Sequence, residues 1–409
     1  MSDTHALHPA REHVPALDGI RGLAILVVMG FHFGLQMPEH TPLEHVVGRV
    51  LGAGWYGVDL FFVLSGLLIT SLLLDAKGGP GYYRAFYGRR ALRIFPLYYG
   101  FLAAYLFLVV RHGASGDDHY LWQKQWWWWS YLDNWWIALV RRTEPPNYLW
   151  VGPFWSLAVE EQFYLLWPTL VLLLSRRKLA LLCAAIIVGA PLFRFWLRAH
   201  HAADVTAYAL TPARLDALAV GSLLAVVLRD PGLARWGRRI ALTTGVAAAA
   251  VVVGTFVRHG GLWTYGGWEE GIGYTVIALA WGGLVTVGAS AAPETPAGRA
   301  LGAGWLRSLG KYSYAMYVFH VPIWSHVRPL LFHGGDPPVL WGSHVPATLA
   351  LALLCGGITY LCALASWHLY EKHFLRLKRY FRYGGPRAMP PEERSAPAGA
   401  AAPEPAAPV

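Results

Sequence analysis

Three polar side chains interrupt an otherwise apolar stretch near the start of the chain, Leu17 to Phe33. At about 100° per residue, the Arg21 and His32 side chains lie within roughly 20° of each other around the helix axis, and Asp18 lies about 60° from Arg21. Because a charge that faces lipid costs about 2.5 to 3.5 kcal/mol, this face should turn toward protein or water. A histidine there can take a proton from a hydroxyl, although a His32 that only bonds a neighbouring helix and a snorkelling Arg21 would explain the same residues.

Carboxylates occur at the predicted depth of His32 in two further apolar stretches. Asp59 lies in GVDLFFVLSGLLI, and Glu160 and Glu161 lie in WSLAVEEQFYLLWP. A carboxylate beside a histidine fixes its tautomer and raises its basicity. The candidate catalytic residues are therefore His32, Glu161, Glu160 and Asp59. Adjacent helical residues point about 100° apart, so at most one glutamate should face His32, and the choice among the three carboxylates stays open. A helix-start position favoured by the macrodipole explains the glutamates equally well.

Arginines precede the third apolar stretch, in YYRAFYGRRALRIFPLYY. Arg90 and Arg93 are three residues apart and share a helical face, which gives a fork suited to phosphate oxygens. The positive-inside rule alone would also place arginines here. The candidate anion-binding residues are Arg21, Arg90, Arg93 and Arg89. About 16 Å of helix separates Arg21 from His32, and a mechanism must bridge that distance.

Other polar residues lie deeper in later apolar stretches. Arg214 and Asp216 are two residues apart and do not face each other, so each needs a partner elsewhere in the bundle. His320, in LGKYSYAMYVFHVPIW, could line an active cavity or form a hydrogen bond between helices.

The elements that must position these residues are membrane helices. The 409 residues are 55% hydrophobic and 14% charged, with a mean hydropathy of +0.36, which excludes both an ordinary soluble domain and a disordered chain. We predict an all-α, polytopic integral membrane protein with about ten transmembrane helices in one bundle. The predicted spans are 17–35, 56–75, 94–111, 155–175, 179–197, 207–228, 240–257, 271–291, 312–330 and 347–371.

The net charge of +10 is mostly an orientation signal rather than a sign of nucleic-acid binding. If the N-terminus is cytoplasmic, strict alternation of the spans places 24 of the 34 Lys and Arg residues inside. The positive-inside rule then predicts that both termini are cytoplasmic. The three cysteines, Cys183, Cys355 and Cys362, all fall in predicted spans and indicate neither a disulfide framework nor a metal site.

Outside the spans, the sequence predicts a cytoplasmic N-terminal segment, residues 1–15, without a cleavable signal peptide, and a membrane domain, residues 16–378. A Pro/Ala-rich disordered cytoplasmic tail follows, residues 379–409. The predicted outer loop 112–154 contains WQKQWWWWSYLDNWW. Its tryptophans favour an interfacial or re-entrant segment, and stacking on a sugar is the alternative.

Five motifs, in order and spacing, carry a family resemblance: LDGIRGLAIL with the following His32, GVDLFFVLSGLLI, FYGRRALRIFPLYY, WSLAVEEQFYLLWP and LGKYSYAMYVFHVPI. From Leu17 to Phe374 the chain resembles the membrane-bound acyltransferase-3 family of bacterial O-acyltransferases. Some members carry a further esterase-like domain after the spans, and here a short Pro/Ala-rich tail follows instead.

The resemblance implies transfer of an acyl group, commonly acetyl from acetyl-CoA, to a hydroxyl of a carbohydrate or related acceptor at the bacterial plasma membrane, without a metal. His32 and Arg21 match the family's first-helix motif, Arg90 and Arg93 its arginine motif, and Glu160 and Glu161 its glutamates. Candidate substrate contacts are Ser65, Trp155, Tyr164 and His320. The acyl group could pass directly or through an acyl-histidine.

The alternative is a transporter or a flippase for a lipid-linked sugar, in which the same buried charges line a passage. The sequence shows no interrupted helices repeated in two halves, and its polar residues concentrate in the first four spans. Both features favour the enzyme. No motif identifies the acceptor, the acyl chain length or the oligomeric state.

Overall fold

The computed structural model describes residues 14–34, 37–111, 117–140, 151–262, 268–333 and 335–383. These residues are helical apart from turns, loops and one isolated β-bridge between Leu340 and Ser343, which confirms the predicted all-α class. The longer helices are α1 (Pro15–Gly34), α3 (Gly57–Ala76), α4 (Tyr82–Arg111), α8 (Phe154–Leu173), α9 (Arg176–Ala199), α11 (Thr211–Val227), α12 (Ala234–His259), α13 (Tyr274–Ser290), α15 (Gly304–Phe332) and α16 (Val345–Ser366). Residues 1–13 and 384–409, which hold most of the predicted terminal segments, lie outside the described residues.

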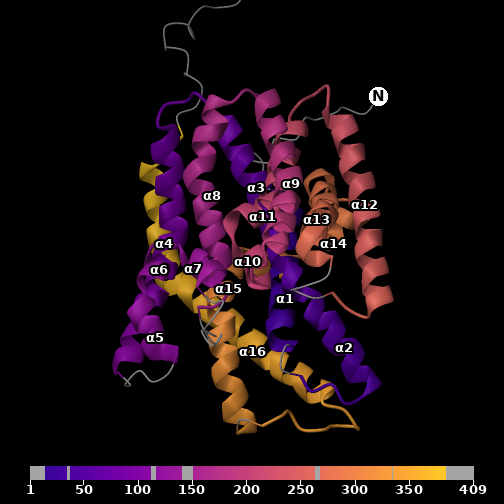
Figure 1. Cartoon of the computed structure of the whole chain (residues 1–409). Coiled ribbons are helices and arrows are strands. Elements are labelled where there is room, and N and C mark those ends of the chain that lie inside the picture. Colours follow the sequence, from indigo (N-terminus) through magenta and orange to yellow (C-terminus); the bar gives the residue numbers. More distant parts are fainter. Residues whose placement is uncertain are drawn as a thin grey trace, which may run out of the picture.

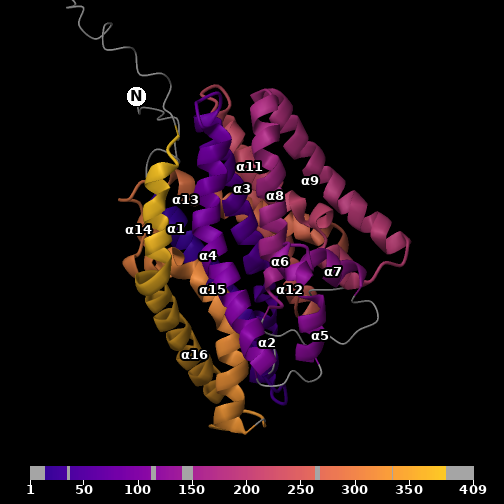
Figure 2. The ribbon, with the colours of Figure 1, turned by 90° about the vertical axis from the view of Figure 1, so that its left-hand side faces the viewer.

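Shorter helices connect the longer ones. They are α2 (Pro42–Gly52), η1 (Ala53–Tyr56), α5 (Asp117–Lys124), α6 (Trp126–Trp129), α7 (Asp133–Leu139), α10 (Asp204–Ala209), η3 (Glu269–Gly273), α14 (Pro296–Leu301), η4 (Trp367–Glu371), α17 (Lys372–Arg376) and η5 (Leu377–Tyr380). The long helices form one bundle, and α2 projects from it together with the ends of α15 and α16 that face it (Figure 1). The last three helices of the described chain, η4, α17 and η5, lie against α4 (Figure 2).

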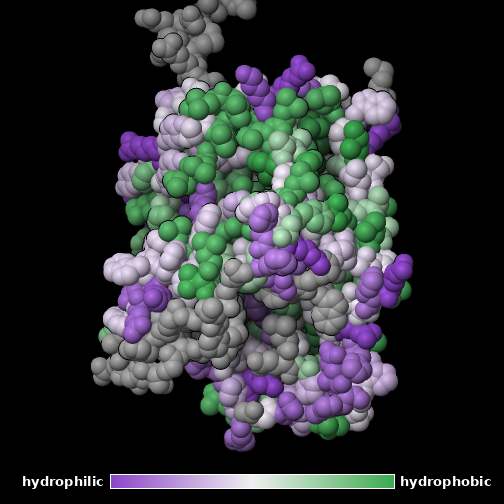
Figure 3. Space-filling model, in the orientation of Figure 1, coloured by the Kyte–Doolittle hydropathy of each residue, from purple (hydrophilic) through white to green (hydrophobic). Residues whose placement is uncertain are grey.

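Eight helical segments in the described part of the chain are long and apolar enough to cross a membrane, so the protein is a polytopic membrane protein. The prediction of about ten spans exceeds this number by two. The other two predicted spans, 155–175 and 312–330, lie in the long helices α8 and α15, which carry polar side chains such as Glu160 and Glu161 in α8 and Lys311 in α15. A broad apolar area covers α8 and α9 in Figure 3, with hydrophilic residues gathered at the bottom of that view.

Close helix packing depends on glycines where the backbones meet. A Cβ at Gly66 of α3 would lie 2.0 Å from the Leu218 carbonyl oxygen of α11, and a Cβ at Gly221 would lie 1.9 Å from the Val63 oxygen. Helices α1 and α15 meet in the same way, because Gly310 of α15 packs on the Asp18 carbonyl. Small residues at such contacts let membrane helices approach closely.

Two buried ion pairs join the central helices. Arg214 of α11 donates to Asp59 of α3 over 2.8 Å, and both side chains are fully buried. Arg194 of α9 lies 3.0 Å from Asp216 of α11, and the Thr275 hydroxyl of α13 bonds Asp216 over 2.6 Å. Arg214 and Asp216 therefore have separate partners, which confirms the expectation from their spacing.

The glycine contacts predict a local steric effect. We expect Gly66→Ala to lower the unfolding free energy by about 1 to 3 kcal/mol, because the added methyl group forces α3 away from α11. The matched control is Gly254→Ala in α12, where an added Cβ meets nothing within 4 Å. Thermal unfolding in detergent should show a lower midpoint for Gly66→Ala alone, and equal midpoints for the two variants would contradict the packing argument.

The buried pair predicts an effect on stability. Asp59→Asn should cost about 3 to 5 kcal/mol, because Arg214 would keep a buried charge without its partner. Asp336 is exposed and lies 3.7 Å from Arg328, so it gives the control variant Asp336→Asn, for which we expect a loss under about 1 kcal/mol. Denaturation of both variants in detergent measures the difference, and an Asp59→Asn protein as stable as Asp336→Asn would refute the structural role.

Candidate active site

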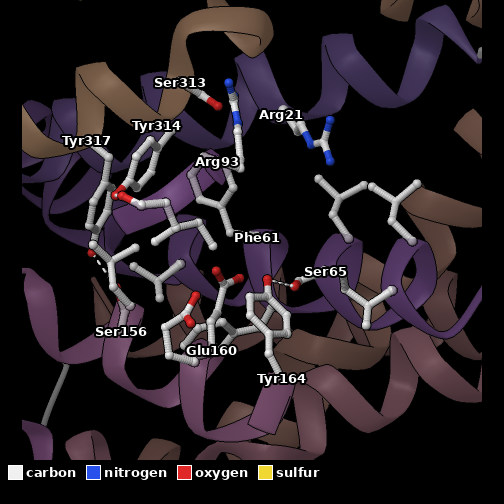
Figure 4. Close-up of a pocket in the computed structure, with 18 of the residues that line it drawn as sticks. Arg21, Phe61, Ser65, Arg93, Ser156, Glu160, Tyr164, Ser313, Tyr314 and Tyr317 are labelled. Atoms are coloured by element: carbon white, nitrogen blue, oxygen red, sulfur yellow. Dashed lines mark hydrogen bonds between the residues drawn. The ribbon is translucent and has the colours of Figure 1, made fainter. Parts of the chain in front are cut away.

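A polar cavity of about 170 Å³ lies among α1, α3, α4, α8 and α15. Its lining contains cationic, anionic and hydroxyl side chains inside an otherwise apolar bundle. These side chains are Arg21, Arg90, Arg93, Glu160, Glu161, Ser65, Ser156, Ser313, Tyr164, Tyr314 and Tyr317. Arg21 and Arg93 lie on one side of the cavity, and Glu160, Tyr164 and Ser65 lie on the other (Figure 4).

A second hollow of about 540 Å³ adjoins this cavity and shares Arg21, Arg93 and Gly310 with it. Its lining adds Arg307 and Lys311 from the first turns of α15. Four cationic side chains therefore surround one entrance. We refer to this entrance as the basic mouth, defined by Arg21, Arg93, Arg307 and Lys311.

Two of these cationic side chains have carboxylate neighbours. Arg21 lies 3.2 Å from Asp18, one turn earlier on α1. Arg93 lies 3.9 Å from the buried Glu371 carboxylate, and its guanidinium carbon is 5.5 Å from the centre of the Trp367 ring. An anion that binds Arg93 therefore meets an arginine already beside a carboxylate.

Hydroxyl groups and carboxylates lie deeper in the cavity. Ser65 Oγ and Tyr164 OH share a hydrogen bond of 2.5 Å, and the Arg90 guanidinium lies 5.4 Å from the centre of the Tyr164 ring. Glu160 faces the same space (Figure 4). Glu161 also lines the cavity, and its buried Oε1 has no hydrogen-bond partner among the described residues. The chamber thus offers hydrogen-bond donors and acceptors to a bound molecule.

The structure brings His32 to another histidine. His32 Nδ1 lies 2.9 Å from the Val28 carbonyl oxygen and 3.2 Å from His320 Nε2, and His320 Nδ1 lies 2.7 Å from the Tyr317 carbonyl oxygen. A carbonyl only accepts, so both Nδ1 atoms carry hydrogen, and neutral His320 accepts at Nε2. In neutral His32 the lone pair is then on Nε2. The main chain and His320 thus provide the orientation that we expected from a carboxylate.

Asp59 was expected to be a possible partner of His32, and this expectation is wrong. Its bonded partner is Arg214, because the ion pair with a fully buried arginine stabilises both charges. Trp155, predicted as a substrate contact, lies away from the cavity. It packs on Tyr208 at 4.6 Å between ring centres and lies near the Arg214 guanidinium, outside the lining of the cavity.

Two more residues lie away from the predicted positions. Arg89 donates to the Phe381 carbonyl and lies over the Tyr383 ring, because it points about 100° away from Arg90 on α4. It lines neither the cavity nor the basic mouth. His320 is fully buried and bonds His32 between helices, so it does not line the cavity as a substrate contact would.

The sequence analysis did not single out the α15 side of the cavity. Gly310, Ser313, Tyr314 and Tyr317 all line it, at the spacing i, i+3, i+4 and i+7 of one helical face. This spacing within LGKYSYAMYVFH could have predicted that these residues share one face of the helix. Ser156 at the start of α8 also lines the cavity and shares a hydrogen bond with Tyr317 over 2.6 Å.

The tryptophan-rich segment forms α5, α6 and α7, with residues 112–116 and 141–150 outside the described part. Trp128 and Trp136 are buried, with ring centres 5.4 Å apart, whereas Trp126 is 74% exposed. These two tryptophans belong to the main hydrophobic core of the bundle, and Trp126 gives the segment an exposed aromatic side. Its expected interfacial or sugar-stacking role stays a prediction.

Comparisons with known proteins agree with this geometry. The chain matches the family model described as an acyltransferase domain over residues 14–367. It is 26% identical over 370 residues to the peptidoglycan O-acetyltransferase OatA of Listeria monocytogenes, an alignment that covers 84% of this chain and 55% of that protein. It is 27% identical over 369 residues to the O-acetyltransferase OatA of Staphylococcus aureus, covering 83% and 55%.

The chain therefore spans little more than half the length of these curated relatives. No solved structure matches it. The family match nevertheless extends from the first described residue through α1, α3, α4, α8 and α15, which together form the cavity. Because it covers most of the sequence, the protein belongs to the acyltransferase 3 family of membrane enzymes.

Proposed function

We propose that the protein moves a short acyl group, acetyl in the first instance, from acyl-CoA to a hydroxyl of a cell-envelope carbohydrate. The observation that carries this proposal is a basic mouth that leads into a cavity lined by hydroxyls and carboxylates within a membrane bundle. Relatives are named for O-acetylation of peptidoglycan, which makes a wall carbohydrate our choice of acceptor class. We place the enzyme in the bacterial plasma membrane.

The residues of the basic mouth fit the donor. Coenzyme A carries phosphates at one end and a thioester at the end of a long, narrow arm. Arg21, Arg93, Arg307 and Lys311 provide cations for the phosphates at the wide hollow. The narrower cavity, with Arg90 inside it, suits the arm and a short acyl group. By the positive-inside rule, we assign the end of the bundle with these cations to the cytoplasm.

We assign His32 as the general base. Its Nε2 takes the proton from the acceptor hydroxyl, whose oxygen forms a C–O bond with the thioester carbonyl carbon as the C–S bond breaks. The proton then passes to the departing thiolate, so no net charge accumulates on His32. Hydroxyls of the cavity, such as Tyr164, donate to the carbonyl oxygen as negative charge develops on it.

Substitution of Arg90 tests whether the cavity is the donor site. We expect Arg90→Ala to raise the KM for acetyl-CoA about tenfold or more, because a charge-assisted hydrogen bond is worth about 1.5 to 3 kcal/mol. Arg89→Ala is the matched control, since the neighbouring arginine lies outside the cavity, and its KM should stay within about twofold. Steady-state kinetics with purified protein measure both values, and equal effects would argue against the cavity as the donor site.

Substitution of His32 tests its proposed role as the general base. We expect His32→Gln to lower kcat by a factor of about 10² to 10⁴, the usual contribution of a general base, while binding of acetyl-CoA stays within about twofold. His326→Gln, an exposed histidine further along α15, should retain activity. Turnover and equilibrium binding of labelled acetyl-CoA give the two quantities. A His32→Gln enzyme with wild-type kcat would remove His32 from the mechanism.

A further inference from the structure

The donor cavity and the proposed base are separate in this structure. His32 and His320 line neither the cavity nor the basic mouth. A transfer step needs the reacting atoms about 3 to 3.5 Å apart. Some residue must therefore stand between the thioester position and the hydroxyl that His32 activates, and that residue must move.

Tyr317 is the residue that contacts both parts. Its side chain lines the cavity, and its ring centre lies 5.5 Å from that of His320. Its carbonyl oxygen accepts from His320 Nδ1 over 2.7 Å, and His320 in turn bonds His32. Tyr317 thus forms the boundary between the cavity and the histidine pair.

Hydrogen bonds fasten the Tyr317 side chain to the start of α8. Its hydroxyl lies 2.6 Å from Ser156 Oγ and donates to the Pro153 carbonyl over 2.8 Å. Figure 4 shows the bond between Tyr317 and Ser156 at the side of the cavity opposite Ser65. Ring contacts support the same position, because the Phe61 ring of α3 meets Tyr317 edge-on at 6.4 Å. The Tyr317 side chain is therefore held at the boundary by two hydrogen bonds and a ring contact, all of which can break and reform.

Helix α15 also has a place to bend beside this boundary. Pro322 lies five residues after Tyr317 inside α15. A proline in a helix removes the hydrogen bond to the carbonyl four residues earlier, here Val318, and favours a kink. The turn from Val318 to Pro322 follows Tyr317 and contains His320, so a small change of bend there would alter how Tyr317 and His320 pack against each other.

We propose that Tyr317 is a gate between the acyl donor and His32. Closed, it keeps water and the histidine pair away from the thioester. Open, it admits the acceptor hydroxyl, so consumption of the donor is coupled to transfer. This inference rests on the proposed function, and it assigns Tyr317 and Ser156 a role in coupling rather than in proton transfer.

The first test measures coupling as the ratio of acetyl-CoA hydrolysis to acetyl transfer. We expect Tyr317→Ala to raise this ratio about tenfold or more. Tyr317→Phe removes the hydrogen bonds of the Tyr317 hydroxyl to Ser156 and Pro153, and Ser156→Ala removes the first of these. Because one such bond is worth about 0.5 to 1.5 kcal/mol, each variant should raise the ratio at least about twofold. Tyr370→Phe is the matched control, because Tyr370 also donates to a proline carbonyl of another helix, Pro96, at 3.1 Å. Unchanged ratios in well-folded Tyr317→Phe and Ser156→Ala proteins would overturn the gate.

The second test needs no catalysis. In a protein with Cys183, Cys355 and Cys362 replaced by alanine, His32→Cys provides a thiol behind the gate. A membrane-impermeant methanethiosulfonate added on the side of the basic mouth should label it at least about tenfold faster when Tyr317→Ala is also present. Equal labelling rates would overturn the gate. A wild-type protein that consumes no acetyl-CoA refutes the proposed function instead, and the labelling result still stands.

Discussion

The cost of placing charge in hydrocarbon is the constraint on which this bundle depends. Asp59 and Arg214 satisfy it by pairing between α3 and α11, and Asp216 satisfies it with Arg194 of α9. Because each partner would be costly alone, these pairs fix how three helices sit against one another. Other polar side chains line the cavity instead of joining the central helices by such pairs. Glu160, Glu161 and Ser65 face a shared space, and the rigid frame around them allows that space to persist.

The sequence was enough to predict the helices and many of the cavity residues. The apolar stretches set the helix positions, and a stripe of polar residues on α1, α4 and α8 indicated Arg21, Arg90 and Glu160. The prediction failed where a partner had to be chosen. Depth along a helix does not give rotation about its axis, so Asp59 and His32 looked adjacent although Asp59 turns toward α11. Pairing across helices, such as His32 with His320, depends on packing that no single stretch encodes.

The site divides into two regions with different chemistry. Toward the basic mouth, arginines and a lysine can bind an anion, and Glu371 already lies beside one of them. Beyond Tyr317, a pair of neutral histidines has its hydrogens fixed by main-chain carbonyls, so the orientation of each ring is set before a substrate arrives. Under the proposed function, this division places anion recognition and proton transfer on separate residues, and α15 contributes to both regions.

The glycine contacts between α1 and α15 act unequally along α15. Near the N-terminus of α15, a Cβ at Gly22 would lie 2.1 Å from the Leu306 carbonyl oxygen, and one at Gly310 would lie 1.8 Å from the Asp18 carbonyl oxygen. The two backbones are therefore in direct contact there. Among the described glycines, none makes such a contact with the part of α15 beyond Pro322. The part of α15 that lines the cavity and the basic mouth is therefore held against α1 through its backbone. Under the proposed function, substitutions beyond Pro322 can accumulate without disturbing the backbone contacts that support the donor site.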